Sequence, residues 1–247
     1  MIYYNGNYTD EENIISIKDC GFTTAIGIFD SMLSLDGRLV HGREHYERIY
    51  HDALTVTGIK FILSYEEFEK ICLKLLEQNN LTNGYGRVRT TVTGGNVLAP
   101  LAPSQSLNIL IGVGNAENPD DMHPIKCHII EDFPRIAGCV LENCKRLDYT
   151  RSYAARRQAE KSGADDAIII NTHGNIACGA TSNIFIEENG ALITPPLSDG
   201  VLAGVTRRKL MEERDIIEES ISIERLKNAD KIYLTNSFFG LRPVILI

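Results

Sequence analysis

The sequence predicts an α+β fold rather than a doubly wound sheet, because strand-like and helix-like segments are mixed without a regular βαβα alternation. Apolar residues make up 43% of the 247 residues and charged residues 23%, which is typical of a folded globular protein. A chain of this length can bury a large core in one lobe or in two. The polar segment 115–124 carries two prolines and is the best boundary between two lobes.

The N-terminal half is expected to contain two tight hairpins and two helices. The dipeptides Asn5-Gly6 and Asp36-Gly37 favour two-residue turns between strands. Apolar residues three to four apart predict a helix within residues 41–59 that ends at Gly58. The pattern Ser64-Tyr65-Glu66-Glu67 predicts a capping box that opens a second helix. The remaining predicted strands are residues 85–93 and 107–113, separated by a Gly/Pro/Ala loop at 94–106.

The C-terminal half is organised around residues 145–207. Residues 145–163 are interpreted as one long amphipathic helix that begins at Lys145. Two apolar strands follow, joined by the Gly-rich segment 171–181, and another helix begins directly after Gly204. The predicted strands of this half include residues 165–170, 182–188, 231–235 and 243–247, with a short helix at 222–228.

Charge and cysteine use argue against several classes of protein. The formal net charge of −8, without a basic stripe, argues against nucleic acid or an anionic membrane as the main partner. The six cysteines include no CxxC pair and the N-terminus has no signal-peptide pattern, which predicts reduced thiols in the cytoplasm. No apolar run approaches the roughly 18 residues of a membrane-spanning helix.

Two features could bind a phosphate group. Gly204 precedes a helix whose first turn holds Val205 and Thr206, and the free N–H groups of a helix N-terminus bind phosphate. The alternative is an ordinary glycine-led helix start. Arg48 could clamp a phosphate with two N–H groups, although most arginines are solvated surface residues.

Lys145 is a candidate amine nucleophile. It follows the mostly apolar segment 136–144, and partial desolvation favours the neutral amine that forms a Schiff base. The alternative is a lysine whose stem lies along the surface at a helix start.

Residues 41–45 match HxxEH, the inverted zinc-protease pattern. Zinc needs both histidines on one helical face and a third ligand. Gly42 places His41 at a cap or strand end, and no obvious third ligand follows. We therefore predict no metal site.

Five blocks follow one another between residues 26 and 244, so that the pattern they form extends over nearly the whole chain. They are IGIFDSMLSLDGRLVHGREHYERI, RVRTTVTGG, KRLDY, GADDAIIINTHGNIACGATSNIFIEENGALITPPLSDGVLAGVTR and LTNSFFGLRPV. They resemble the class IV aminotransferases, the fold-type IV pyridoxal-phosphate enzymes. That family includes branched-chain and D-amino acid aminotransferases and 4-amino-4-deoxychorismate lyase. The resemblance implies a smaller N-terminal α/β lobe over residues 1–115, a linker over 116–124, and a larger, β-barrel-like lobe over 125–247 that carries the cofactor lysine. It also implies a homodimer.

The resemblance assigns roles to individual residues. Lys145 matches the lysine that forms the Schiff base with pyridoxal 5′-phosphate and then moves a proton. Tyr149 matches a tyrosine near the cofactor's O3′ atom. The implied phosphate ligands are Arg48, Val205, Thr206 and Ser237, and the residues implied to hold a substrate carboxylate are Arg89 and Phe238.

One departure from the family pattern concerns the cofactor's ring nitrogen. Members usually read G-x-V-x-E-G-x-x-S-N-x-F, and their glutamate keeps the pyridine nitrogen protonated. Cys178 occupies the glutamate position here, and a neutral thiol cannot replace a carboxylate in that role. A thiolate could, if the site lowered the thiol's pKa.

The sequence therefore predicts a cytoplasmic, homodimeric aminotransferase that acts on a small amino acid, with Cys178 expected to weaken its activity. The main alternative is elimination of pyruvate from 4-amino-4-deoxychorismate. The loop at 93–100 lacks the Arg and His that D-amino acid aminotransferases place there, which disfavours that activity. A third alternative is a binding protein that kept the fold and lost efficient catalysis.

Overall fold

The computed structural model describes residues 1–99, 101–121 and 123–247. Pro100, in the predicted loop, and Met122, in the predicted linker, lie outside the described residues. The chain forms two compact units, each described below by itself. The first comprises Met1–Asn118 together with Cys144–Asp148, and the second comprises Pro119–Asn143 together with Tyr149–Ile247.

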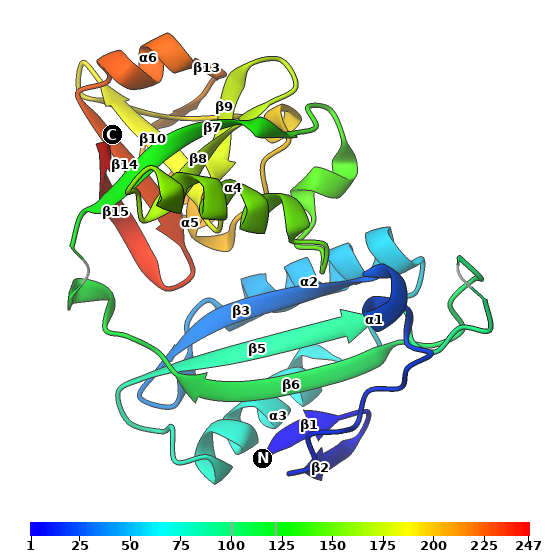
Figure 1. Cartoon of the computed structure of the whole chain (residues 1–247). Coiled ribbons are helices and arrows are strands. Elements are labelled where there is room, and N and C mark those ends of the chain that lie inside the picture. Colours follow the sequence, from blue (N-terminus) through cyan, green and yellow to red (C-terminus); the bar gives the residue numbers. More distant parts are fainter. Residues whose placement is uncertain (100, 122) are drawn as a thin grey trace. The chain divides into compact units, whose positions relative to one another are not determined.

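The first unit is an antiparallel sheet with two helices on one face (Figure 1). Its strand order is β2-β1-β6-β5-β3-β4. Its elements are β1 (Ile2–Tyr4), β2 (Asn7–Thr9), α1 (Cys20–Thr24), β3 (Gly27–Leu35), β4 (Arg38–Leu39), α2 (Gly42–Thr57), α3 (Tyr65–Gln78), β5 (Tyr85–Thr93) and β6 (Asn108–Asn115).

Local sequence signals account for the turns and helix ends of this unit. Both predicted hairpins are present, with positive φ at Asn5, Gly6, Asp36 and Gly37, as a type I′ turn requires. Helix α2 ends at Gly58, whose left-handed conformation lets its N–H bond to Leu54. The predicted capping box is also present: Ser64 and Glu67 bond reciprocally at the start of α3.

The core of the first unit lies between the sheet and the two helices. Alternate residues of β3, among them Ile28 and Met32, are fully buried and meet Ile49 of α2. Phe68 and Leu75 contribute the buried face of α3. Because side chains alternate across a strand, the odd-numbered residues of β3 point to the other face of the sheet.

The second unit contains a closed six-stranded barrel. Strands β10-β14-β15-β7-β8-β9 form consecutive pairs, and β9 returns to β10 through the Cys178–Asn183 pair. Two pairs, β15–β7 and β7–β8, are parallel. The elements are η1 (Pro119–Asp121), β7 (Ile125–Arg135), η2 (Val140–Asn143), α4 (Thr150–Lys161), β8 (Asp166–Asn171), β9 (Asn175–Gly179), β10 (Asn183–Glu188), β11 (Ala191–Thr194), η3 (Leu197–Asp199), α5 (Val205–Glu213), β12 (Ile216–Glu218), β13 (Ile221–Ser222), α6 (Ile223–Asn228), β14 (Lys231–Asn236) and β15 (Phe239–Leu246).

The barrel and the mixture of helices and strands confirm the predicted α+β fold with a β-barrel-like second lobe. The barrel interior is apolar, because one buried isoleucine or leucine after another projects inward from neighbouring strands. None of the described helices has the length and apolar character needed to cross a membrane.

The prediction of one helix over residues 145–163 was wrong at its start. Helix α4 begins at Thr150, five residues after Lys145. Residues 145–147 instead pair with the edge of β3: the Lys145 carbonyl accepts from Phe29 N–H at 2.9 Å, and Leu147 N–H donates to Gly27 at 3.0 Å. This pairing is why Lys145 belongs to the first unit, although lobe 125–247 was expected to carry it.

The Gly-rich segment 171–181 is also more regular than predicted. It contains strand β9, whose residues from Ile176 to Gly179 are all buried. The glycines and polar residues obscured an apolar strand that closes the barrel.

Candidate active site

Lys145 is held against the first sheet by its backbone and by its side chain. Its N–H donates to Asp52 Oδ2 at 2.8 Å, and its carbonyl accepts from Phe29. Its Nζ atom lies 4.6 Å from the centroid of the Phe29 ring, within the range of a cation–π contact. The amine is therefore tied to one rigid strand, β3.

Arg89 contacts the same aromatic ring as Lys145, that of Phe29. Strand β5 directs the side chains of Val88 and Thr90 into the core, so Arg89 points to the opposite face. Its guanidinium carbon lies 4.0 Å from the Phe29 ring centroid. The structure thus brings together Lys145 and Arg89, the predicted amine and the predicted carboxylate-binding cation, on one buried phenylalanine.

Arg48 is buried, so the interpretation of a solvated surface arginine was wrong. Its Nε and Nη2 atoms donate to the two oxygens of Asp30 at 2.7 and 3.0 Å. His45 Nδ1 lies 2.7 Å from Asp30 Oδ1. Asp30 therefore occupies the Nε–Nη2 edge of the guanidinium, and a bidentate phosphate would have to meet the Nη1–Nη2 edge.

The surroundings of Asp30 and His45 favour an ionised carboxylate and a neutral imidazole. Burial opposes ionisation of Asp30, but Arg48 and His45 outweigh it and hold the pKa of Asp30 below its ordinary value. Burial lowers the pKa of His45, despite the opposing effect of Asp30, which favours a neutral imidazole. His45 of the HxxEH pattern thus orients Asp30, while His41 takes a left-handed cap position at φ 54°.

In the second unit, the N-terminus of helix α5 has the features of an anion site. Gly204 is the cap residue and lacks a side chain that could satisfy the first-turn N–H groups, which include those of Val205 and Thr206. Thr206 Oγ1 donates to the Asn236 carbonyl at 2.9 Å, and Ser237 is the next residue. Three of the predicted phosphate ligands, Val205, Thr206 and Ser237, are therefore brought together.

A glycine is required at position 204 for a second reason. A Cβ atom there would lie 2.0 Å from Asn183 Oδ1. Asn183 in turn donates from Nδ2 to the Leu202 carbonyl at 2.9 Å and pairs with Cys178 across β9 and β10. The cap of α5 is thus positioned by the same strand pair that holds Cys178. Backbone donors, hydroxyls and this close approach fit a phosphate group.

Cys178 is buried, and its surroundings favour the thiol. Burial raises the pKa of Cys178, and Glu142 and Asp166 raise it further, while Arg135 opposes them. The thiolate alternative is therefore disfavoured. Glu142 is itself buried and ion-paired, at 3.0 Å to Arg135 and 2.5 Å to Arg151.

Sequence reasoning did not single out Arg135 and Glu142. Their only sequence signal was a pair of opposite charges within an otherwise apolar segment before Lys145. The other two predicted residues are half-buried. Tyr149 occupies the N-cap position of helix α4 without a side-chain capping bond. Phe238 lies in the turn after β14, where its N–H donates to Asn236 Oδ1 at 2.8 Å.

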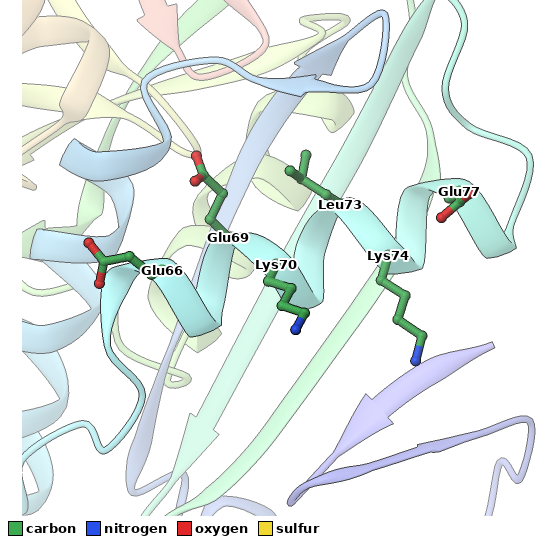
Figure 2. A pocket seen from close by; sticks show the side chains of 6 residues that line it. All are labelled: Glu66, Glu69, Lys70, Leu73, Lys74 and Glu77. Carbon is green, nitrogen blue, oxygen red and sulfur yellow. The ribbon is translucent and has the colours of Figure 1, made fainter.

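An open depression on helix α3 is a separate feature (Figure 2). Its lining residues come from one helix and are mostly charged, with Lys74 stacked 3.9 Å from the Tyr8 ring centroid. They are Glu66, Glu69, Lys70, Leu73, Lys74 and Glu77. The predicted site residues lie elsewhere, and charges spaced along one helix face describe a solvated surface.

Comparison with known proteins agrees with the fold and with the predicted class of enzyme. The model of the family "Amino-transferase class IV" matches residues 27–247. The chain is 31% identical to a protein of Methanocaldococcus jannaschii described as "Putative branched-chain-amino-acid aminotransferase", over 98% of this chain and 86% of the relative. It is 30% identical to the D-alanine aminotransferase of Staphylococcus haemolyticus, over 100% of this chain and 88% of the relative.

A solved structure of Legionella pneumophila, titled "Putative 4-amino-4-deoxychorismate lyase", superposes with a TM-score of 0.88 at 27% identity. The superposition covers 96% of this chain and 88% of that one. The chain belongs to the class IV aminotransferase family. The predicted class of enzyme, a transaminase or lyase that uses pyridoxal phosphate, is thereby confirmed.

Proposed function

We propose that the chain is a cytoplasmic, homodimeric aminotransferase that transfers the amino group of a small amino acid through a Schiff base on Lys145. The observation that carries this proposal is the shared contact of Lys145 and Arg89 with Phe29. This contact places an amine and a candidate carboxylate-binding cation on one aromatic ring, as a substrate with an α-carboxylate requires. The similarity to two named aminotransferases supports it.

Residues of each unit have a proposed role. In the second unit, Val205, Thr206 and Ser237 are the proposed phosphate ligands, through the N–H groups at the start of α5 and the Ser237 hydroxyl. In the first unit, Arg48, which Asp30 holds in position, is also a proposed phosphate ligand. Tyr149 would hold the cofactor near its O3′ atom, as the family resemblance implies. When bound, the cofactor withdraws electrons from the substrate's Cα. Lys145 would move the proton at that carbon, and Arg89 would orient the carboxylate. Phe238 is proposed separately as a carboxylate-orienting residue of the second unit.

Cys178 sets how well this chemistry proceeds. A buried neutral thiol cannot hold a proton on the ring nitrogen as a carboxylate does. We therefore expect weaker electron withdrawal and slower transamination than in relatives that carry glutamate at this position.

The second candidate is elimination of pyruvate from 4-amino-4-deoxychorismate, with Lys145 as base and then acid. The similarity to the Legionella structure, together with the lyase-like block LTNSFFGLRPV, favours it. Transfer to D-amino acids is disfavoured despite the similarity to a D-alanine aminotransferase, because residues 93–99 contain neither arginine nor histidine.

One pair of assays distinguishes these reactions. The enzyme is incubated with 4-amino-4-deoxychorismate and pyruvate is measured, and in parallel with amino donors and 2-oxoglutarate, with glutamate as the readout. We expect amino transfer to dominate; pyruvate without amino transfer would establish the lyase instead. Lys145→Ala should abolish the activity, whereas Lys161→Ala, at an exposed position, should not. If neither pyruvate elimination nor amino transfer were detected, the result would favour a binding protein that lost catalysis.

A further inference from the structure

We propose that His51, Asp52 and Cys144 form a binding site for a divalent transition-metal ion, of which Zn²⁺ is the best match, directly beside Lys145. The ligand atoms of these three side chains all lie within 4.8 Å of one another. His51 and Asp52 are neighbours in the chain, whereas Cys144 follows them by more than 90 positions and is brought to them by the fold. None of the three residues is among the cofactor or substrate ligands proposed above, although Cys144 and Asp52 adjoin Lys145.

The three side chains are held by rigid parts of the first unit. His51 and Asp52 come from helix α2, and Cys144 precedes the segment that pairs with β3. His51 Nδ1 lies 3.0 Å from Asp52 Oδ1, while Asp52 Oδ2 accepts the Lys145 N–H at 2.8 Å. Asp52 and Cys144 are buried, at 2% and 4% exposure, and the His51 side chain is 67% exposed.

The chemistry of the three ligands suits zinc. One imidazole nitrogen, one thiolate sulfur and one carboxylate oxygen are the donor types that Zn²⁺ takes in proteins, with a fourth position available to water on the exposed side. Bond lengths of about 2.0–2.3 Å in a tetrahedral site place ligand atoms about 3.3–3.8 Å apart. The observed spread of up to 4.8 Å therefore requires shifts on the order of 1 Å. The ion replaces the thiol proton, which leaves to solvent.

Binding would act on Lys145 through two direct links. Cys144 is the preceding residue, and Asp52 already accepts the Lys145 N–H. An ion bound by these residues would attach the segment around Lys145 to helix α2. The competing account is that the three residues only anchor this segment by hydrogen bonds and bind no ion.

Binding of Co²⁺ to the holoenzyme tests the proposal, since tetrahedral cobalt is coloured and can replace zinc. We expect one Co²⁺ per chain, visible ligand-field bands, a sulfur-to-cobalt charge-transfer band after subtraction of the cofactor spectrum, and displacement of all of these by Zn²⁺. Cys144→Ser should abolish the charge-transfer band. Cys139→Ser, which removes a more accessible thiol, should leave it unchanged.

His51→Ala keeps the test decisive if Cys144→Ser folds poorly, because His51 is exposed and its removal spares the core. We expect Co²⁺ affinity to fall by roughly tenfold or more. Circular dichroism confirms folding. Absence of the cobalt bands in the native enzyme, an unchanged charge-transfer band in folded Cys144→Ser, or unchanged affinity in His51→Ala would each overturn the proposal.

Discussion

The backbone N–H of Lys145 donates a 2.8 Å hydrogen bond to Asp52 Oδ2, although 93 positions separate the two residues in the chain. A carboxylate on helix α2 thus fixes the backbone of the residue proposed to carry the cofactor. Because Asp52 is buried, water cannot readily replace it. The position of Lys145 therefore depends on the packing of α2 against β3.

Asp52→Ala should destabilise the protein by about 1–3 kcal/mol, because a buried N–H group loses its acceptor. Asp52→Asn retains an oxygen that can accept this hydrogen bond and should destabilise the protein less than Asp52→Ala. Urea denaturation of the cofactor-free protein measures the difference. Equal destabilisation by the two substitutions would show that charge, rather than the hydrogen bond to Lys145, explains the role of Asp52.

Asp30→Asn should lower the free energy of unfolding by about 3–5 kcal/mol at neutral pH, since it removes one partner of a buried ion pair. The folded protein lowers the pKa of Asp30, so its contribution is complete above the unfolded value of about 3.9 and is lost as the pH falls toward the folded value. Urea denaturation at pH 7 and pH 3 should therefore show a smaller acid-induced loss in Asp30→Asn than in the native protein.

The control is Glu66→Gln, which removes an exposed carboxylate 3.7 Å from Arg43. Such surface pairs contribute about 0–1 kcal/mol. If Asp30→Asn behaved like this control at neutral pH, the Asp30–Arg48 pair would not position Arg48 as described.

Cys178→Glu should raise the single-turnover rate of amino transfer by about tenfold or more, equivalent to about 1.4 kcal/mol of the barrier. The reason is that a carboxylate can hold a proton on the ring nitrogen and the buried thiol cannot. Stopped-flow absorption of the half-reaction measures the rate, with Cys178→Ala as the control that should show no gain. An unchanged or lower rate in folded Cys178→Glu would mean that another group, or water, already serves the nitrogen.

Gly204→Ala should weaken cofactor binding and destabilise the protein by about 1–3 kcal/mol, the usual range for overpacking. The added Cβ would lie 2.0 Å from Asn183 Oδ1 and would displace the start of helix α5. Cofactor affinity is followed by titration of the apoenzyme. Gly240→Ala is a matched control, because its Cβ meets no atom within 4 Å. Similar affinities for the two variants would contradict a phosphate site at this helix end.

Features with a local cause could be predicted from the sequence. The turn at Asn5-Gly6, the capping box at Ser64 and the helix stop at Gly58 each depend on residues that are neighbours in the chain. The glycine before helix α5 was found for the same reason. The resemblance to a known family supplied the candidate site residues that local signals could not.

Features that depend on distant contacts could not be predicted. The hydrophobic pattern of 145–163 extends a helix back to Lys145, but pairing with β3 commits that backbone elsewhere. Nothing near Arg48 in the sequence indicates that Asp30 is its partner, and nothing near Lys145 indicates that it shares Phe29 with Arg89. These relationships arise only when the sheet forms.

The most direct test of the central claim is borohydride reduction of the purified holoenzyme followed by peptide mass spectrometry. We predict that the yellow colour disappears and that the cofactor becomes attached to the peptide containing Lys145, because reduction of a Schiff base leaves a stable secondary amine. Attachment at another lysine, or recovery of an unmodified Lys145 peptide from a fully loaded enzyme, would contradict the account.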